Sequence, residues 1–465
     1  MKLQGRQRHP GPEDERYPLP KLVAYGTQHI LTMYGGVIAP PLIVGGAAGL
    51  SGGDIALLVT AGLFVSGAAT LLQTLGLGRV GSRLPIVQGI SFASVSTMVT
   101  IANADGLRAV YGAIIVAGLI GLVLSSFFAK LVRLFPAVVT GTIITVIGLS
   151  LMPVALKWAM GNDAHKSDYG SMGNIGFAGL TLLIILVISR VFQGAISRLS
   201  ILIGLVAGTV IAAIAGRTDF SEVGRAELIA LPEFFPSGAP TFEVGAIISM
   251  TIVILVIMTE TTADILAIGE IVGTEVDSGR VADGLRADMA STAIAPVFGA
   301  FPCSAFAQNV GLVALTGIKS RFVVATGGLV LLVLGLVPVI GAVVAGIPSP
   351  VLGGAAVVLF GSVAASGIRT LARVQFHDNL NMLIVAVAIA AGLIPIAAPT
   401  FWDAFPESFA VIMHSGISAT AIVAILLNLL FNELTIGNRS GASVFTAAQD
   451  ERDGFGERID DDIRD

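Results

Sequence analysis

Polar side chains and backbone breaks occur together in one apolar segment, residues 301–317. Gln308 and Asn309 are adjacent amides there, and one proline and two glycines interrupt a run apolar enough to lie in a bilayer. Such features are tolerated at membrane depth where they are buried in protein or line a cavity. Each amide offers an acceptor and a donor, so the pair can read the C=O and N–H edge of a purine or pyrimidine. The alternative is an amide clasp between helices.

Two carboxylates, Glu260 and Asp264, stand four residues apart in another apolar stretch. This spacing places both on one face of a helix. A carboxylate at the bilayer centre costs about 2.5–3.5 kcal/mol on insertion scales, so both must face a cavity or a polar partner. Such a group can exchange a proton near neutral pH, or it can accept hydrogen bonds from the N–H groups of a heterocycle. Asp264 could instead hold a neighbouring helix.

Three further residues in apolar stretches are candidates for the same site. Asp288 is either a functional group within the membrane or a charge near the cytoplasmic interface, close to Arg286. We expect His29 to support the site by hydrogen bonding, because a buried imidazole needs a partner. Phe92 follows a proline–glycine break and could stack on a flat ring or simply pack.

The composition is that of a polytopic helical membrane protein. Hydrophobic residues make up 54% of the 465 residues and charged residues only 12%, with a mean hydropathy of +0.89. Soluble domains carry roughly 25% charged residues, so a soluble interaction module is excluded. The single cysteine, Cys303, allows neither an intramolecular disulfide nor a thiol–metal site. The polar, proline-rich residues 1–20 are not a cleavable signal peptide.

Apolar windows of about 20 residues predict fourteen spans. They lie at residues 22–46, 54–78, 85–103, 109–128, 134–153, 175–192, 199–216, 244–268, 281–300, 303–317, 322–346, 351–367, 380–398 and 408–432. With both termini in the cytoplasm, the N-terminal tail holds five Lys and Arg, six cytoplasmic loops hold two each, and the C-terminal tail holds four. That places 21 of 26 inside, which is a strong positive-inside bias.

Fourteen spans suggest two repeats of seven, the second inverted because seven is odd. Spans 3 and 10 occupy matching places, and each opens with a proline followed by a glutamine near a glycine, at Pro85 with Gln88 and at Pro302 with Gln308. Matched broken segments indicate a midplane binding site in a secondary transporter.

The motifs together resemble the nucleobase–ascorbate transporter family over essentially the whole chain. The most specific element is Gln308-Asn309-Val310-Gly311 with Thr316-Gly317, and Glu260 with Asp264 has the spacing of the family's purine members. The resemblance implies that Glu260 and Gln308 bind the base, with Ser91, Phe92, Ala307 and Asn309 as further predicted substrate contacts. It also implies that Asp288 is tied to proton coupling, with Asp264 and His29 in support.

The family fold implies an all-α polytopic membrane protein with fourteen spans in 7+7 inverted repeats. It further implies short strands in discontinuous spans 3 and 10, a core domain, a gate domain and a homodimer. The expected parts are a cytoplasmic N-terminal tail (1–20), core halves (21–130 and 244–347), gate halves (131–243 and 348–436) and a disordered cytoplasmic tail (437–465).

These features predict a proton-coupled importer of xanthine or uric acid in the cytoplasmic membrane, and not an enzyme. We expect no cofactor, no metal and no nucleic-acid partner.

A uracil permease is the closest alternative, but uracil-type members usually carry Glu where this chain has Gln308. Sodium could replace the proton. A sulfate-type anion exchanger could share the fold but has no need of Glu260. An intramembrane aspartyl protease using Asp264 and Asp288 would need Gly-x-Gly-Asp and Tyr-Asp motifs, which the chain lacks.

Overall fold

The protein is a helical bundle built around one short pair of strands. The computed structural model describes residues 11–128, 134–376 and 380–434. Among these, nine helices are long and apolar enough to cross a membrane, and one bent helix pair makes a possible tenth span. The whole of the predicted C-terminal tail, residues 437–465, and residues 1–10 of the predicted N-terminal tail lie outside the described residues.

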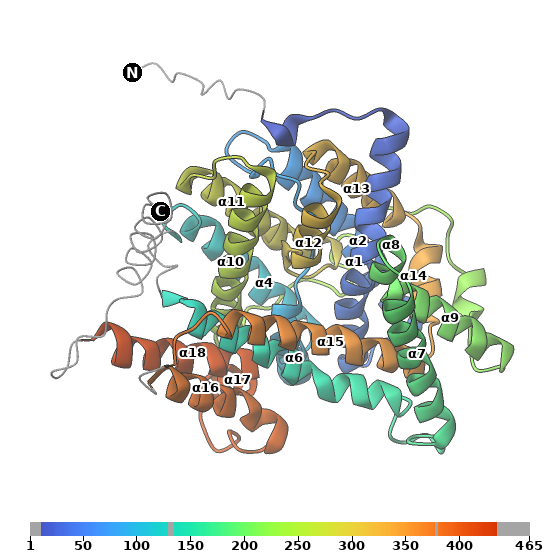
Figure 1. Cartoon of the computed structure of the whole chain (residues 1–465). Coiled ribbons are helices and arrows are strands. Elements are labelled where there is room, and N and C mark those ends of the chain that lie inside the picture. The colour runs from blue at the N-terminus through green and yellow to red at the C-terminus, as the bar shows by residue number, and fades with distance from the viewer. Residues whose placement is uncertain (1–10, 129–133, 377–379, 435–465) are drawn as a thin grey trace, which may run out of the picture.

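The elements follow the predicted order of two repeats (Figure 1). The first half contains α1 (Leu19–Ala47), α2 (Gly52–Leu75), β1 (Gln88–Ile90), α3 (Val95–Asp105), α4 (Leu107–Leu124), α6 (Ala137–Ala159), α7 (Met172–Val191), α8 (Ala195–Arg198) and α9 (Ser200–Ile214). The second half contains α10 (Val244–Val272), α11 (Ser278–Ile294), β2 (Cys303–Ala305), α12 (Ala307–Thr316), α13 (Arg321–Leu334), α14 (Pro338–Ala345), α15 (Ser349–Leu371), α16 (Leu380–Ala397), α17 (Glu407–His414) and α18 (Gly416–Asn428).

Each predicted span coincides with a helix, a helix pair or a strand followed by a helix. The 7+7 inverted-repeat fold and the strands of spans 3 and 10 are confirmed. The predicted span over 322–346 coincides with a helix pair that is bent, since α13 and α14 meet at 79°. Gly335 ends α13 against the backbone of Phe64, and Pro338 begins α14. A proline at position 338 could not continue α13, because it lacks an N–H and its ring would clash with the preceding turn, whereas it is tolerated in the first turn of α14.

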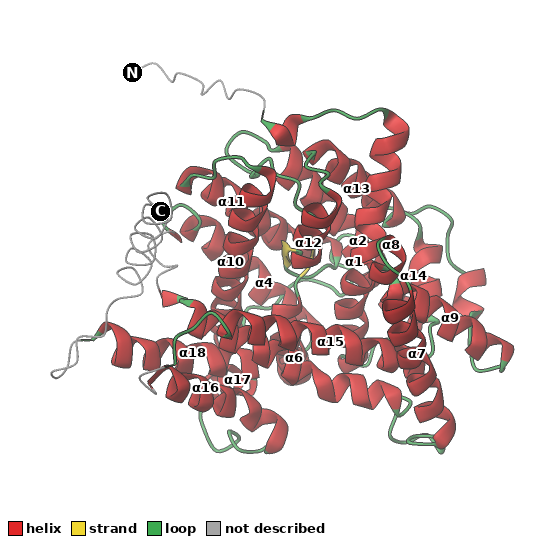
Figure 2. Ribbon diagram, viewed as in Figure 1, coloured by secondary structure: helices red, strands yellow, loops and turns green. Residues whose placement is uncertain are grey.

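The helices pack as two groups. The strand-bearing group contains α1, α2, α3, α4 and α10 to α14, with α13 packed on α1 and α2 and with α4 packed on α10 and α11. The outer group contains α6, α7, α9 and α15 to α18. Its most extensive helix–helix contact is between α6 and α15. Figure 2 shows the strands enclosed near the centre of the molecule, behind α12.

Glycines allow the helices of each group to approach closely. A Cβ on Gly67 of α2 would lie 2.4 Å from the backbone nitrogen of Leu332 in α13. In the outer group, a Cβ on Gly148 of α6 would lie 2.4 Å from the backbone nitrogen of Ala364 in α15. Membrane helices gain their association from such close packing, because lipid tails are as apolar as the side chains.

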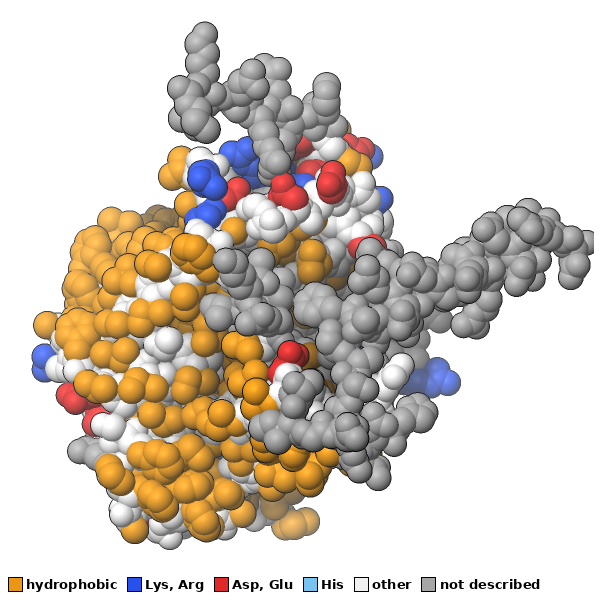
Figure 3. All heavy atoms as spheres, turned by 90° about the vertical axis from the view of Figure 1, so that its left-hand side faces the viewer, with side chains coloured by type: hydrophobic (Ala, Val, Ile, Leu, Met, Phe, Trp, Pro, Cys, Tyr) orange, Lys and Arg blue, Asp and Glu red, His pale blue; other side chains and the backbone are white. Residues whose placement is uncertain are grey.

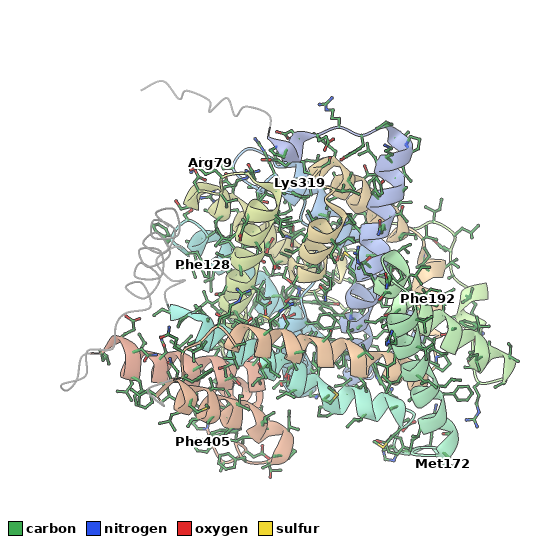
Figure 4. The ribbon with its side chains drawn as sticks, viewed as in Figure 1. Arg79, Phe128, Met172, Phe192, Lys319 and Phe405 are labelled. Atoms are coloured by element: carbon green, nitrogen blue, oxygen red, sulfur yellow. The ribbon has the colours of Figure 1, made fainter. Side chains whose placement is uncertain are left out.

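Charged side chains gather at one end of the molecule, beyond a broad apolar surface (Figure 3). Arg79 and Lys319 lie at that end, whereas Met172 and Phe405 lie at the opposite end (Figure 4). This separation agrees with the predicted alternation of the loops between the two sides of the membrane.

The N-terminal segment is fastened to the same charged end. Glu13 Oε1 accepts from Arg280 Nη2 at 2.7 Å, and Asp14 Oδ1 accepts from Arg321 Nε at 2.7 Å. Arg280 also donates to the backbone carbonyl of Ser82 at 2.8 Å. The segment therefore joins three loops that the positive-inside pattern assigns to one side.

Candidate functional site

The centre of the molecule is an antiparallel strand pair made by the two broken spans. Gln88 pairs with Ala305, and Ile90 pairs with Cys303. The pair is extended by hydrogen bonds on both sides, since Ser91 N donates to the Pro302 carbonyl at 2.8 Å and Phe306 N donates to the Val87 carbonyl at 3.1 Å. A strand at membrane depth needs such pairing, because lipid offers its backbone no partner.

Each strand runs directly into a half-helix. Phe306 is the residue before α12, and a single 3-10 turn at Phe92–Ser94 separates β1 from α3. Both half-helices therefore begin beside the strand pair. Helix N-termini carry unsatisfied N–H groups and partial positive charge, so this arrangement favours electron-rich atoms of a ligand.

Phe306 fixes the shape of this region through two glycines. A Cβ on Gly89 would lie 2.4 Å from the Phe306 ring, and a Cβ on Gly36 of α1 would lie 2.7 Å from the same ring. The ring is buried, so β1 and α1 can hold it only because both positions lack side chains. Sequence reasoning missed Phe306, although it directly precedes the predicted contact Ala307.

Asn309 ties three segments together. Its Oδ1 accepts from the backbone N–H of Val87 at 2.9 Å, and its Nδ2 lies 2.6 Å from Nδ1 of His29 in α1. The amide oxygen of Asn309 accepts from the N–H of Val87, so the amide is oriented with Nδ2 toward His29. Asn309 Nδ2 therefore donates, and His29 Nδ1 accepts. Both side chains are buried. Asn309 therefore makes the kind of contact between helices that was the alternative to base recognition for the amide pair.

Gln308 differs from its neighbour. It is exposed, and its side-chain amide makes no hydrogen bond with the described residues. It lines a cavity of about 280 Å³ together with residues of α1, α9, α12 and α15, and Phe306, Arg198 and Ser362 are also in its wall. Sites for drug-sized ligands measure roughly 300–1,000 Å³, so this cavity is of a size for a smaller heterocycle.

Glu260 and Asp264 lie one turn apart in α10, which packs on β2 and α12. Both are half-buried, and neither carboxylate makes a hydrogen bond with the described part of the chain. Glu260 is not in the wall of the cavity that contains Gln308. The structure thus brings the two main predicted ligands to adjoining elements but does not place both in one cavity.

Asp288 is enclosed by protein, beside the strand pair. The carboxylate is fully buried in α11, and Thr261 donates its hydroxyl to Oδ2. Thr261 also accepts the backbone N–H of Ala305 at 3.3 Å. α11 carries Asp288 about three turns from its N-terminus, so this carboxylate is buried beside the strands and not exposed near Arg286 at the surface.

Phe92, which directly follows Ser91, lies where the strand-bearing group meets the outer group. Ser91 is buried, and its hydroxyl has no hydrogen-bond partner among the described residues. The Phe92 ring is half-buried and contacts the ring of Phe360 in α15, with centroids 6.0 Å apart. Phe92 therefore bridges the two groups in this conformation.

Comparisons with known proteins agree on one family. Residues 20–401 match a model described as a permease family, that of the nucleobase–ascorbate transporters. The chain is 40% identical to the uric acid permease PucJ of Bacillus subtilis over 416 residues, which is 89% of this chain and 93% of that protein. It is also 40% identical to the xanthine permease of the same bacterium over 412 residues, covering 89% and 94% of the two chains.

A solved structure supports the fold independently. The transmembrane domain of the cyanobacterial bicarbonate transporter BicA aligns with a TM-score of 0.56 at 17% identity, covering 90% of this chain and all of that chain. At this identity the likeness concerns the fold alone.

Proposed function

The chain belongs to the nucleobase–ascorbate transporter family, and we propose that it imports an oxidised purine, xanthine or urate, together with a proton. The observation that carries the substrate proposal is Gln308. Its amide is free of protein hydrogen bonds and faces a cavity beside the start of a half-helix. An amide can pair with an adjoining N–H and C=O of an oxopurine.

Glu260 supplies the second proposed contact. It is a half-buried carboxylate inside a membrane span without a hydrogen-bond partner among the described residues. Such a group is a functional candidate by default, because its desolvation is otherwise uncompensated. We propose that it accepts N–H groups of the base when α10 and α12 close around the substrate, with Ser91, Phe92 and Ala307 completing the site.

We propose that the remaining predicted residues support the site without contacting the base. Asn309 and His29 hold β1, α12 and α1 together, and Asp288 carries the coupling proton with Asp264 nearby. No Lys, Arg or His of the described residues forms an ion pair with Asp288. A buried carboxylate without a counter-ion is a suitable proton carrier.

Helix packing supports different roles in transport for the two groups of helices. We propose that the strand-bearing group is the core domain that carries substrate and that the outer group is the gate domain. Arg198 belongs to a loop predicted to be cytoplasmic and lies in the cavity wall, so we propose that the cavity opens toward the cytoplasm. We also propose cytoplasmic termini, residence in the cytoplasmic membrane and a homodimer.

Competition for uptake tests the substrate. Transporter-deficient cells expressing the full chain would be given labelled xanthine with an excess of unlabelled urate, xanthine or uracil. We expect xanthine and urate to suppress the signal and uracil to leave it unchanged. Absence of labelled-xanthine uptake, together with uptake of labelled uracil by the same cells, would assign the protein to the pyrimidine branch.

A further inference from the structure

Thr261 connects the proposed proton carrier to the proposed substrate site. It follows Glu260 directly in α10, its hydroxyl donates to Asp288 of α11, and it accepts the Ala305 N–H of β2. Thr261 and Asp288 are both 0% exposed. One hydroxyl therefore joins three elements, of which one carries Glu260 and another leads through Phe306 to Gln308.

The hydroxyl of Thr261 has a single proton, and this makes the contact sensitive to the state of Asp288. An ionised carboxylate accepts only, so Thr261 donates to it and keeps its lone pairs for Ala305 N–H. When Asp288 gains a proton, one of its oxygens becomes a donor and its hold on the Thr261 proton weakens, since hydrogen bonds to charged groups are the stronger ones.

The side chain of Gln88 can also respond to the gain or loss of a proton by Asp288. Its side chain lies beside Asp288 and acts on the carboxylate as a hydrogen-bond donor. Neither amide atom nor Asp288 Oδ1 reaches full hydrogen-bond geometry with the described residues, and all three atoms are buried. An amide can turn its N–H₂ toward an ionised carboxylate or its carbonyl toward a protonated one. Its backbone is fixed by Thr70, whose Oγ1 accepts from Gln88 N at 2.9 Å.

Other ionisable groups around Asp288 are few. Asp264 acts on it from α10, and the Cys303 thiol lies near it in β2. Helices α2 and α4 also pack on α11, but Asp54 of α2 is bonded to Ser51 and Arg108 of α4 is bonded to the Ala239 carbonyl. Tyr111 of α4 donates to the Gly299 carbonyl.

We infer that Thr261 is the positioning residue that transmits the protonation of Asp288 to Glu260 and to the strand pair, with Gln88 as the second group that responds to it. This inference rests on the proposed proton-coupled transport. Protonation and substrate binding are then linked through hydrogen bonds, without a direct contact between Asp288 and the base.

The chain offers a matched control for testing Thr261. Thr262 is the next residue and is also buried, but its hydroxyl donates only within its own helix, to the Met258 carbonyl at 2.7 Å. Thr261→Val and Thr262→Val remove the same group from adjacent positions, and Thr261→Ser keeps the hydroxyl. Gln88→Met provides a second variant if Thr261→Val does not reach the membrane.

Concentrative uptake of labelled xanthine would be measured against external pH, alongside exchange of labelled for unlabelled xanthine with a protonophore present. Loss of a donor to an ionised carboxylate favours its protonated form, so the alkaline limb of the profile should move upward by about one pH unit in Thr261→Val. Concentrative uptake should fall about tenfold while exchange persists. Gln88→Met should shift the limb in the same direction.

Thr261→Ser and Thr262→Val should retain the wild-type profile. A wild-type profile in Thr261→Val, or an equal shift in Thr262→Val, would overturn the inference while leaving the proposed transport intact. If Thr261→Val does not reach the membrane, a wild-type profile in Gln88→Met would overturn it. Wild-type uptake that ignores pH would overturn the coupling itself, so the two failures are told apart by the wild-type arm.

Discussion

Asn309 Nδ2 donates to His29 Nδ1 across 2.6 Å, joining two residues that are 280 positions apart in the chain. The other atom of the same amide, Oδ1, accepts from Val87 N, so the three segments α1, α12 and the start of β1 share one amide. The geometry of the neighbouring Gln308 depends on this junction.

Replacing His29 tests that junction. His29→Leu leaves the buried Asn309 N–H₂ without its acceptor, at a cost of about 1–3 kcal/mol. We expect a lower melting temperature of the purified protein in detergent and reduced uptake. His29→Asn can place an amide oxygen near the position of Nδ1 and should recover part of both.

His165 is the matched control for this pair, because it lies exposed in a loop. Its replacement by Leu should change neither quantity. Equal stability of His29→Leu and the wild type would show that the contact does not hold the site.

The strands and half-helices of the site could be predicted from the sequence, because Pro85 and Pro302 break otherwise apolar spans at matching positions. The bend between α13 and α14 could not, since hydropathy is continuous through Pro338. Phe306 and Thr261 were missed because their roles depend on partners distant in the chain, namely Gly89 and Asp288. No local pattern distinguishes such residues from ordinary packing side chains.

Glu260→Gln tests the second proposed contact with the base. The change removes the charge and replaces one acceptor with a donor, which would face an N–H of the base. A mismatched buried group costs about 1–3 kcal/mol or more, so active uptake should be lost while membrane insertion stays normal. Unchanged uptake in this variant would return Glu260 to a structural role.

Gln308→Glu tests whether the side chain at this position recognises the C=O and N–H groups of the purine. An ionised carboxylate only accepts, so a purine C=O would meet an acceptor and the affinity for xanthine or urate should fall. Discrimination through buried hydrogen bonds can be large, because the mismatched groups stay unpaired. Competition curves on wild type and variant would measure the change. An unaltered oxopurine affinity would mean that Gln308 does not read the base.

The N-terminal ion pair should stabilise the strand-bearing group. Arg280 and Glu13 are only 4% and 6% exposed, and removal of one partner from a buried pair costs about 3–5 kcal/mol. Glu13→Ala should therefore lower the melting temperature in detergent clearly. The exposed pair of Arg225 with Glu222 is the control, and Glu222→Ala should have little effect. Similar losses from both variants would argue against a special role for the N-terminal segment.

Coupling of purine movement to a proton gradient is the central claim, and reconstituted vesicles test it most directly. The purified full chain in proteoliposomes would be given labelled xanthine or urate under an imposed pH gradient, acidic outside, or under an inward sodium gradient at equal pH. We predict accumulation with the pH gradient alone and its collapse on addition of a protonophore. Accumulation that follows sodium and survives the protonophore would contradict the account.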